Sequence, residues 1–230
     1  AAASLTEGFL EIEKVYEADH EDVEIVYNFA GSQMLTSQIE GGGCPDCFFS
    51  ANTKYPMKLV TELGTVGDKE LFEEDVDVFA SNSLTVIYSK DIELGSVEDM
   101  FLAIDKEDLK IVVANESVPV GKYTKNLLDV FAEAGFTEGV GSFYDHVISY
   151  ETDVKSVVAK VEMEEADMGV VYKTDLVNVD LATLEIPDDY NQTGVYGSLL
   201  FSEEEEAEAF YEFVLDGGGR TILDDYNFGR

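Results

Sequence analysis

Two cysteines have the spacing that most directly suggests chemistry, because Cys44 and Cys47 form the C-x-x-C motif Cys-Pro-Asp-Cys. Such a pair can form a redox disulfide or supply half of a zinc site. The sequence has no second C-x-x-C, and its two histidines, His20 and His146, are far from the motif in sequence. A metal site is therefore not expected. A local disulfide and two unpaired thiols both remain open, and neither would carry the main function.

Signatures of catalysis are missing from the chain. There is no G-x-S-x-G nucleophile elbow, no phosphate-binding P-loop and no H-E-x-x-H metalloprotease motif. We therefore expect a protein that is not an enzyme and that needs no cofactor.

The charge balance restricts the partners. The net charge is −35, from 49 acidic and 14 basic residues. A field of this sign repels nucleic acid and anionic membrane surfaces, so neither is expected as a partner. We interpret the acidic surface as a device for solubility in a salty or crowded exterior.

The length and the ends of the chain suggest a processed, two-lobed protein. With 230 residues, of which 45% are hydrophobic, the chain is long enough for two cores. No stretch approaches the 18 or more apolar residues of a membrane span. The chain starts at Ala1 with no basic and apolar leader. We therefore expect a form from which a signal segment and a short first strand have been removed.

The first part of the chain alternates helices and strands. Ser4 and Glu7 have the spacing of a capping box, which predicts a helix that starts at Ser4. The apolar residues of this helix recur at helical spacing: Leu5, Phe9, Ile12 and Tyr16. Alternating apolar residues over 23–29 predict a strand that leads through a tight turn to Ser32 and a second helix.

The second part repeats this alternation. An extended run over 76–88 is long enough to cross from one lobe to another, with the crossover near Ser81. Helices are predicted near 97–103, 120–134 and 154–165, and strands at 110–114, 147–150 and 170–172. This order predicts an α/β fold of mostly parallel sheets flanked by helices, with ligands at strand-to-helix turns. The first lobe is expected at 1–80 plus about 192–230, and the second at about 81–191, including the return crossover.

Several short segments, in this order along the chain, resemble the periplasmic molybdate-binding proteins of ABC importers. They are Ala1–Thr6, Phe29–Ser32, Pro45–Asp46 with Phe49–Ala51, Val118–Tyr123, Thr152–Val154 and Gly169–Tyr172. The resemblance implies a two-lobed type II periplasmic-binding-protein fold with a double crossover hinge and one oxyanion in the cleft. It implies a monomer outside the cytoplasmic membrane, periplasmic or extracellular, with or without a lipid anchor. Its partners would be an ABC permease and a cytoplasmic ATPase.

The same resemblance implies a set of ligand-binding residues. Ser4 and Ser32 would donate hydroxyl and backbone N–H groups from the first lobe. Val120 and Val154 would donate backbone N–H groups from the second, and Tyr172 its phenol. Four of these five lie at predicted helix starts, where unpaired amides and the helix dipole favour an anion. These groups would contact oxyanion oxygens and not the metal.

The residue types in this set limit the ligand. A site of hydroxyl and amide donors without a carboxylate cannot accept a proton, so it prefers a fully deprotonated, tetrahedral dianion over hydrogen phosphate. Molybdate, tungstate and sulfate meet this condition. Lys122 is close in sequence but outside the set, and Glu116 is the nearest candidate for an additional carboxylate ligand.

Two alternatives remain beside molybdate or tungstate delivery. One is a binder of sulfate or of another tetrahedral oxyanion, and the other is a ligand-sensing module, which would need an effector domain. Each serine is also a preferred helix N-cap, and each of the other three is an ordinary core residue type.

Overall fold

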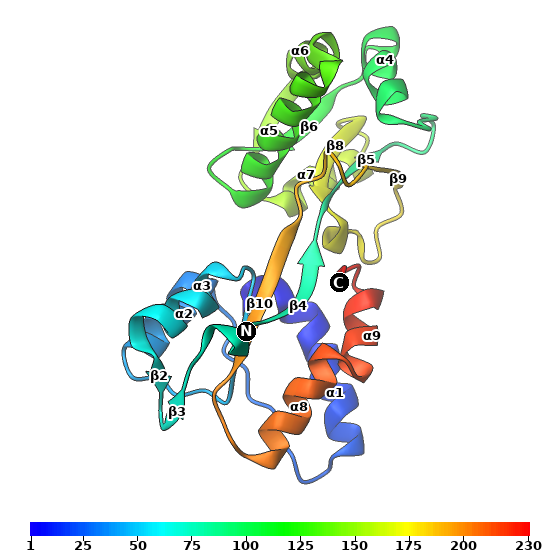
Figure 1. Cartoon of the computed structure of the whole chain (residues 1–230). Coiled ribbons are helices and arrows are strands. Elements are labelled where there is room, and N and C mark those ends of the chain that lie inside the picture. The colour runs from blue at the N-terminus through cyan, green and yellow to red at the C-terminus, as the bar shows by residue number, and fades with distance from the viewer. The chain divides into compact units, whose positions relative to one another are not determined.

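The chain divides into two units that are connected twice. We describe a computed structural model of residues 1–230 (Figure 1). Unit 1 comprises Ala1–Asn82 and Gly194–Arg230, and unit 2 comprises Ser83–Thr193. The chain therefore leaves unit 1 after Asn82 and returns to it at Gly194.

Unit 1 contains a small sheet surrounded by helices. Its first portion consists of η1 (Ala3–Leu5), α1 (Thr6–Asp19), α2 (Ser32–Glu40), β1 (Cys47–Ser50), α3 (Lys54–Lys58), η2 (Leu59–Leu63), the hairpin β2 (Thr65–Val66) and β3 (Lys69–Glu70), η3 (Glu73–Asp75) and β4 (Asp77–Asn82). After the return come β10 (Gly194–Leu200), α8 (Glu205–Leu215) and α9 (Gly218–Asp225). The sheet order is β1-β10-β4, and both pairs are antiparallel.

Helix α1 buries the apolar stripe that its sequence predicts. Leu5, Phe9 and Ile12 are completely buried, and Tyr16 is 2% exposed. The predicted start at Ser4 is wrong, however. A 3-10 turn at Ala3–Leu5 precedes α1, whose N-cap is Leu5, so Ser4 does not cap this helix.

The predicted strand over 23–29 is extended but does not form a ladder. The burial of its side chains alternates as expected. Val23, Ile25 and Tyr27 are half-buried, whereas Val26 is 82% exposed. Strands require a bonded neighbour, and no strand of unit 1 pairs with this segment. Only its end is paired, where Ala30 forms a parallel bridge with Ala2.

Unit 2 has a five-stranded sheet covered by helices. Its elements are β5 (Leu84–Tyr88), α4 (Val97–Glu107), β6 (Ile111–Ala114), α5 (Pro119–Phe131), η4 (Ala132–Phe136), α6 (Thr137–Asp145), β7 (Val147–Glu151), α7 (Val154–Glu162), β8 (Met168–Tyr172), η5 (Lys173–Leu176) and β9 (Ala182–Glu185). The buried residues of β5, β6 and β8 form one core with the inner faces of α4, α5 and α7. Gly135, at φ +104°, separates α5 from α6, in a conformation that glycine adopts readily.

The strand directions in unit 2 follow the chain connections. The order is β7-β6-β8-β5-β9, and the two pairs that β6 makes, with β7 and with β8, are parallel. Strand β5 pairs antiparallel with both β8 and β9. The α/β class is confirmed, and the parallel arrangement is found where helices connect successive strands. Strands β4 and β10, by which the chain leaves unit 1 and returns to it, pair antiparallel with each other.

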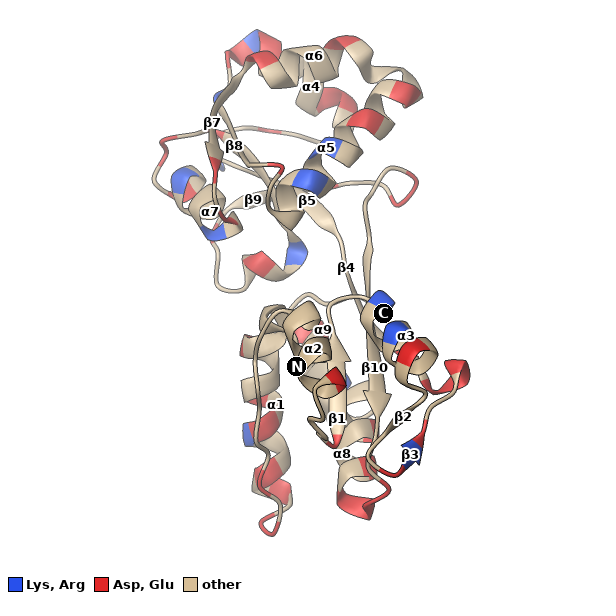
Figure 2. Cartoon of the chain, turned by 90° about the vertical axis from the view of Figure 1, so that its left-hand side faces the viewer, with Lys and Arg blue, Asp and Glu red and all other residues tan.

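Acidic side chains are spread over helices and loops of both units (Figure 2). The basic residues are fewer. Helices α5 and α7 carry two lysines each, which together are 4 of the 14 basic residues in the chain. These two helices therefore offset part of the negative charge locally. No helix has the length and hydropathy needed to cross a bilayer.

Candidate oxyanion site

Three of the predicted site residues lie at one edge of the sheet in unit 2. Val120 follows β6, Val154 follows β7, and Tyr172 is the last residue of β8. These three strands are adjacent and parallel, in the order β7-β6-β8. Their carboxyl ends therefore meet at the same edge, which is where parallel α/β sheets bind ligands.

The start of α5 exposes amide groups that the protein does not use. The N-cap is Val118, whose apolar side chain makes no capping hydrogen bond, and Pro119 has no N–H to satisfy. The amides of Val120 and Gly121 make no hydrogen bond within the chain. The positive end of the helix dipole adds to these two donors, so this turn is suited to an anion.

Gly121 fixes this helix start against the end of β6. A Cβ atom at this position would lie 2.2 Å from the Asn115 carbonyl oxygen and 2.5 Å from that of Ala114. No side chain fits at such distances from backbone atoms. The close approach of α5 to β6, and with it the position of the Val120 amide, therefore requires glycine.

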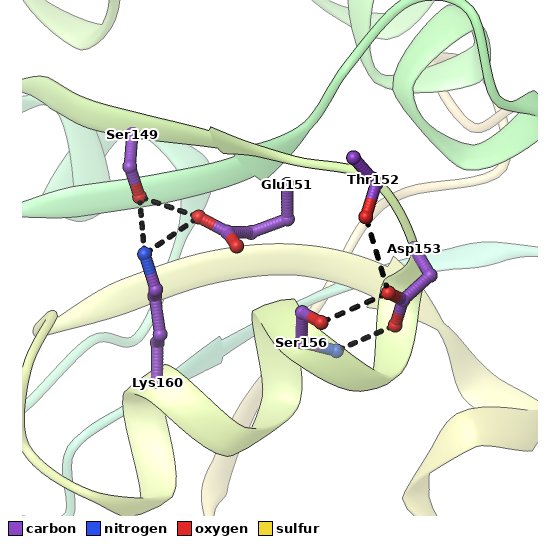
Figure 3. A network of polar contacts seen from close by, with 6 residues as sticks. All are labelled: Ser149, Glu151, Thr152, Asp153, Ser156 and Lys160. Atoms are coloured by element: carbon purple, nitrogen blue, oxygen red, sulfur yellow. Dashed lines mark hydrogen bonds and ion pairs between the residues drawn. The ribbon is translucent and has the colours of Figure 1, made fainter.

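The start of α7 differs because a carboxylate caps it (Figure 3). Asp153 Oδ1 accepts a hydrogen bond from the Ser156 amide at 2.8 Å, and Oδ2 accepts one from the Ser156 hydroxyl at 2.9 Å. These bonds hold the pKa of Asp153 below its usual value, and the bond from the Ser156 backbone amide contributes most to the shift. The cap leaves the Val154 N–H without a partner in the chain. Both Asp153 oxygens therefore accept hydrogen bonds from its own helix.

A second set of polar side chains, also shown in Figure 3, connects α7 to β7. Lys160 Nζ donates to Glu151 Oε1 at 2.7 Å and to Ser149 Oγ at 3.0 Å, and Ser149 Oγ donates to the same Glu151 oxygen at 2.7 Å. The hydrogen bond from Lys160 is the main reason that the pKa of Glu151 is lowered. Helix α7 is thus connected to the end of β7 both through the chain and through this network.

Tyr172 is held at its backbone and at its ring. Its N–H donates to Asp175 Oδ2 at 3.1 Å, and its half-buried ring lies edge-on to that of Tyr123 in α5, at 6.2 Å between centroids. The phenol therefore comes from the same sheet edge as the α5 and α7 amides.

The two serines come together in unit 1 in a comparable way. Ala2 and Ala30 form a parallel bridge, and Ser4 and Ser32 each follow a bridge residue by two positions. Ser32 is the first residue of α2, whose N-cap is Gly31. Neither serine is therefore an N-cap, because α1 begins after a 3-10 turn and α2 begins one residue earlier than a serine cap would require.

The hydroxyl groups of both serines have partners within unit 1. Ser32 Oγ accepts a hydrogen bond from the Ala51 amide at 3.0 Å. Ser4 Oγ lies 3.2 Å from the hydroxyl of Tyr196 in β10. Ser4 is exposed, whereas Ser32 is 7% exposed.

Sequence reasoning missed several residues of these two groups. Tyr196 is 192 positions from Ser4, and no local pattern connects them. Asp153 carried a readable signal, because an Asp three residues before Ser156 at a helix start is typical of an N-cap. Gly121 carried a weaker one, as a glycine directly after the Pro119-Val120 helix start.

The remaining candidates lie outside these two groups. Glu116 is exposed in the turn before α5, and Lys122 is exposed on α5. Cys44 and Cys47 are both free thiols. Burial raises the pKa of Cys47 to about 12, so this thiol stays protonated at neutral pH.

Comparison with known proteins gives consistent matches along the whole chain. Residues 1–229 match the sequence profile of a family described as bacterial extracellular solute-binding protein. A Bacillus subtilis protein named as the ABC transporter substrate-binding lipoprotein YvgL is 31% identical over 237 residues, covering 99% of this chain and 84% of that protein.

Two further relatives carry ligand names. The molybdate-binding protein ModA of Haemophilus influenzae is 27% identical over 239 residues, covering 99% of this chain and 87% of that protein. A solved structure titled as the substrate-binding domain of a molybdenum ABC transporter from Clostridium difficile superposes with a TM-score of 0.83 at 28% identity, covering 100% of this chain and 96% of that one.

Proposed function

Because the chain belongs to the bacterial extracellular solute-binding proteins, we propose that it binds molybdate or tungstate outside the cytoplasmic membrane and delivers the anion to an ABC importer. The names of its relatives support this ligand. The fold supports it as well, since the α/β architecture with two connections is that of type II periplasmic-binding proteins. The family is one of transport components, and we propose that this chain has no catalytic activity.

The observation that carries the proposal is the placement of neutral donors. The amides of Val120 and Val154 and the side chain of Tyr172 belong to the ends of three adjacent parallel strands, and the two amides have no partner in the chain. Ser4 and Ser32 follow a pair of bridged residues in unit 1. We propose that one oxyanion accepts hydrogen bonds from both groups.

The chemistry of these donors favours a fully deprotonated dianion. Backbone N–H groups only donate, and Asp153, the carboxylate directly before Val154, uses both oxygens within α7. A ligand oxygen that carries a proton would find no acceptor among these amides, which is costly for a desolvated donor. Molybdate, tungstate and sulfate carry no proton at neutral pH, whereas phosphate does.

Binding to both groups would also supply a mechanism for closure. A ligand shifts a conformational equilibrium only by its differential affinity for the two states. An oxyanion that contacts donors from both units binds the closed state better and therefore populates it. The closed monomer would then be the form that docks on the permease, which a cytoplasmic ATPase drives.

Calorimetric titration with molybdate, tungstate, sulfate and phosphate tests the ligand. We expect molybdate and tungstate to bind tightly, sulfate more weakly and phosphate least. Tightest binding of sulfate would favour the sulfate-binding alternative. No binding of any of the four anions would reject the proposed function.

The substitution Ser32→Ala tests the site. It removes one hydrogen bond to a charged ligand, which is worth about 1.5–3 kcal/mol, so we expect molybdate affinity to fall by roughly ten- to a hundredfold. Ser202→Ala is the matched control, because that hydroxyl also accepts a hydrogen bond from a backbone amide, that of Glu204 at 3.2 Å, and belongs to the segment between β10 and α8. Unchanged affinity in Ser32→Ala would remove Ser32 from the site.

A further inference from the structure

The protein itself fills an acceptor position on the hydroxyl of Ser32. The donor is the Ala51 amide at 3.0 Å, and an N–H can only donate, so the direction of this bond is fixed. Thr36 approaches Ser32 as well, but its hydroxyl donates to the main-chain carbonyl and not to Oγ. The single proton of the Ser32 hydroxyl is thus left for a ligand.

Ser4 has an equivalent partner in Tyr196. The two hydroxyl oxygens are 3.2 Å apart, and geometry alone allows either to donate. A phenol is a stronger acid than an aliphatic alcohol, so the favoured direction runs from Tyr196 to Ser4. Ser4 then receives a hydrogen bond, as Ser32 does, and keeps its own proton available.

Tyr196 is well placed to impose this direction because it is held firmly. It is 5% exposed, and its ring packs edge-on against Phe79 at 6.2 Å and Phe228 at 5.4 Å between centroids. Its backbone lies at a break in the β10–β4 register, between Tyr196 and Gly197. Such bulges redirect a side chain relative to the regular ladder. Ser4, by contrast, is an exposed serine in a short turn, whose side chain has three staggered rotamers available.

We propose that Tyr196 is a positioning residue that turns the Ser4 hydroxyl into an obligatory donor, as the Ala51 amide does for Ser32. This inference rests on the proposed function, and it names the device that selects the ligand class. Both serines offer a proton and have an acceptor position already filled. With one of its two lone pairs filled, each serine oxygen offers its proton more readily than its remaining lone pair. A ligand oxygen that accepts is therefore favoured, so hydrogen phosphate is disfavoured relative to sulfate, a tetrahedral anion of similar size without a proton.

The substitution Tyr196→Phe tests this, because it removes one oxygen and keeps the ring in place. We expect molybdate and sulfate affinities to fall about three- to tenfold, the effect of one neutral hydrogen bond. Phosphate affinity should stay constant or rise, because the Ser4 oxygen becomes free to accept the ligand proton. The sulfate-to-phosphate affinity ratio should therefore fall, a change that a loss of packing would not produce.

Tyr211→Phe is the matched control. The Tyr211 hydroxyl bonds to Ser198 at 2.8 Å and donates to Asp77 at 3.0 Å, both in unit 1, and not to Ser4. This variant should lose stability in urea unfolding while keeping the wild-type affinity ratio. An equal change of the ratio in both variants would overturn the inference.

A double-mutant cycle with Ser4→Ala decides whether Tyr196 acts through Ser4. We expect Tyr196→Phe to change molybdate affinity less than twofold once Ser4 is alanine. Losses that simply add would show that Tyr196 acts independently and would overturn the inference while leaving the proposed function intact. A wild-type protein that binds none of the anions would overturn both.

Discussion

The two units supply donors of different kinds. In unit 1 the proposed donors are the side-chain hydroxyls of Ser4 and Ser32, each of which has a hydrogen-bonding neighbour. In unit 2 two of the donors are main-chain amides, and their direction is set by where a helix starts. A hydroxyl rotates and is removed by a single substitution, whereas an amide is fixed by the fold and survives most substitutions.

The two helix starts in unit 2 differ from each other as well. Helix α5 has an apolar N-cap and leaves the Val120 and Gly121 amides open. Helix α7 is capped by Asp153, which engages the Ser156 amide and leaves that of Val154. In unit 2, the first-turn amides of α5 receive no side-chain cap, whereas one amide of α7 does. The capping residue therefore affects how many backbone N–H groups stay open at each helix start.

This contrast teaches where the site is vulnerable. Unit 1 should respond to loss of a side-chain oxygen, as in Ser32→Ala. Unit 2, apart from the Tyr172 phenol, should respond only to changes that move or remove a backbone N–H. Three predictions test this difference.

The largest effect is expected from Gly121→Ala. The added Cβ would lie 2.2 Å from the Asn115 carbonyl oxygen, so the start of α5 must move away from β6. Such overpacking costs about 1–3 kcal/mol of unfolding free energy. The displaced Val120 and Gly121 amides should also lower molybdate affinity by about a hundredfold, as estimated from two hydrogen bonds to a charged ligand.

Gly141→Ala in α6 is the control for Gly121→Ala. Nothing lies within 4 Å of a Cβ at Gly141. This change should raise the unfolding free energy by about 0.5–1 kcal/mol, because glycine is unfavourable inside a helix. Urea unfolding and calorimetry measure both variants, and wild-type affinity in Gly121→Ala would mean that the start of α5 takes no part in binding.

A smaller loss of affinity, due to the backbone N–H of residue 154 alone, is expected from Val154→Pro. Proline is favoured in the first turn of a helix, and Asp153 already has the extended conformation that a residue before proline requires, at φ −157° and ψ 161°. The helix should therefore persist without the N–H of residue 154. Loss of one amide bond to the anion should lower affinity about ten- to a hundredfold.

Val154→Ala completes this test, because it trims the half-buried side chain but keeps the N–H. Affinity should change less than about threefold, with some loss of stability from the smaller side chain. If the alanine variant lost as much affinity as the proline variant, the side chain and not the amide would be the functional group, and the contrast between the units would fail.

The parts of the fold that the sequence predicted are those in which one strong local pattern decides the structure. The stripe of α1 is buried, and β6, α5, β7 and α7 occur in the expected order. In each, apolar periodicity agrees with a cap, a proline or a β-branched run. The family and its oxyanion-binding relatives were also predictable, from short segments spread over the chain.

Features that depend on distant neighbours were not predictable. Residues 23–29 alternate correctly, yet a ladder needs an adjacent strand, and no strand of unit 1 pairs with them. The contact between Ser4 and Tyr196 joins positions 192 residues apart. Helix α9 was missed because three successive glycines, 217–219, indicate a break, although they lie at the helix start against Phe213 of α8.

The smallest effect is expected from Asp153→Asn. This substitution keeps the helix cap but removes the negative charge of the capping residue. Asparagine caps a helix about as well as aspartate, so the Ser156 amide should stay satisfied and α7 should start at the same residue. The wild-type pKa is lowered, so Asp153 is ionised at neutral pH and lies next to the amide that the anion would use. Removing this like charge should raise molybdate affinity about two- to fivefold at low salt. The gain should disappear near 1 M salt, where the screening length is only about 3 Å.

The pH dependence of stability supplies an independent check on Asp153. A lowered folded pKa stabilises the fold above the ordinary value of 3.8 and loses that contribution as the pH falls through the folded pKa. The difference in stability between wild type and Asp153→Asn should therefore be constant from pH 5 to 8, by this reasoning, and should shrink below about pH 4. An affinity gain that persisted in high salt would show that asparagine had altered the donors of α7, and the capped helix would then differ from α5 by geometry and not by charge.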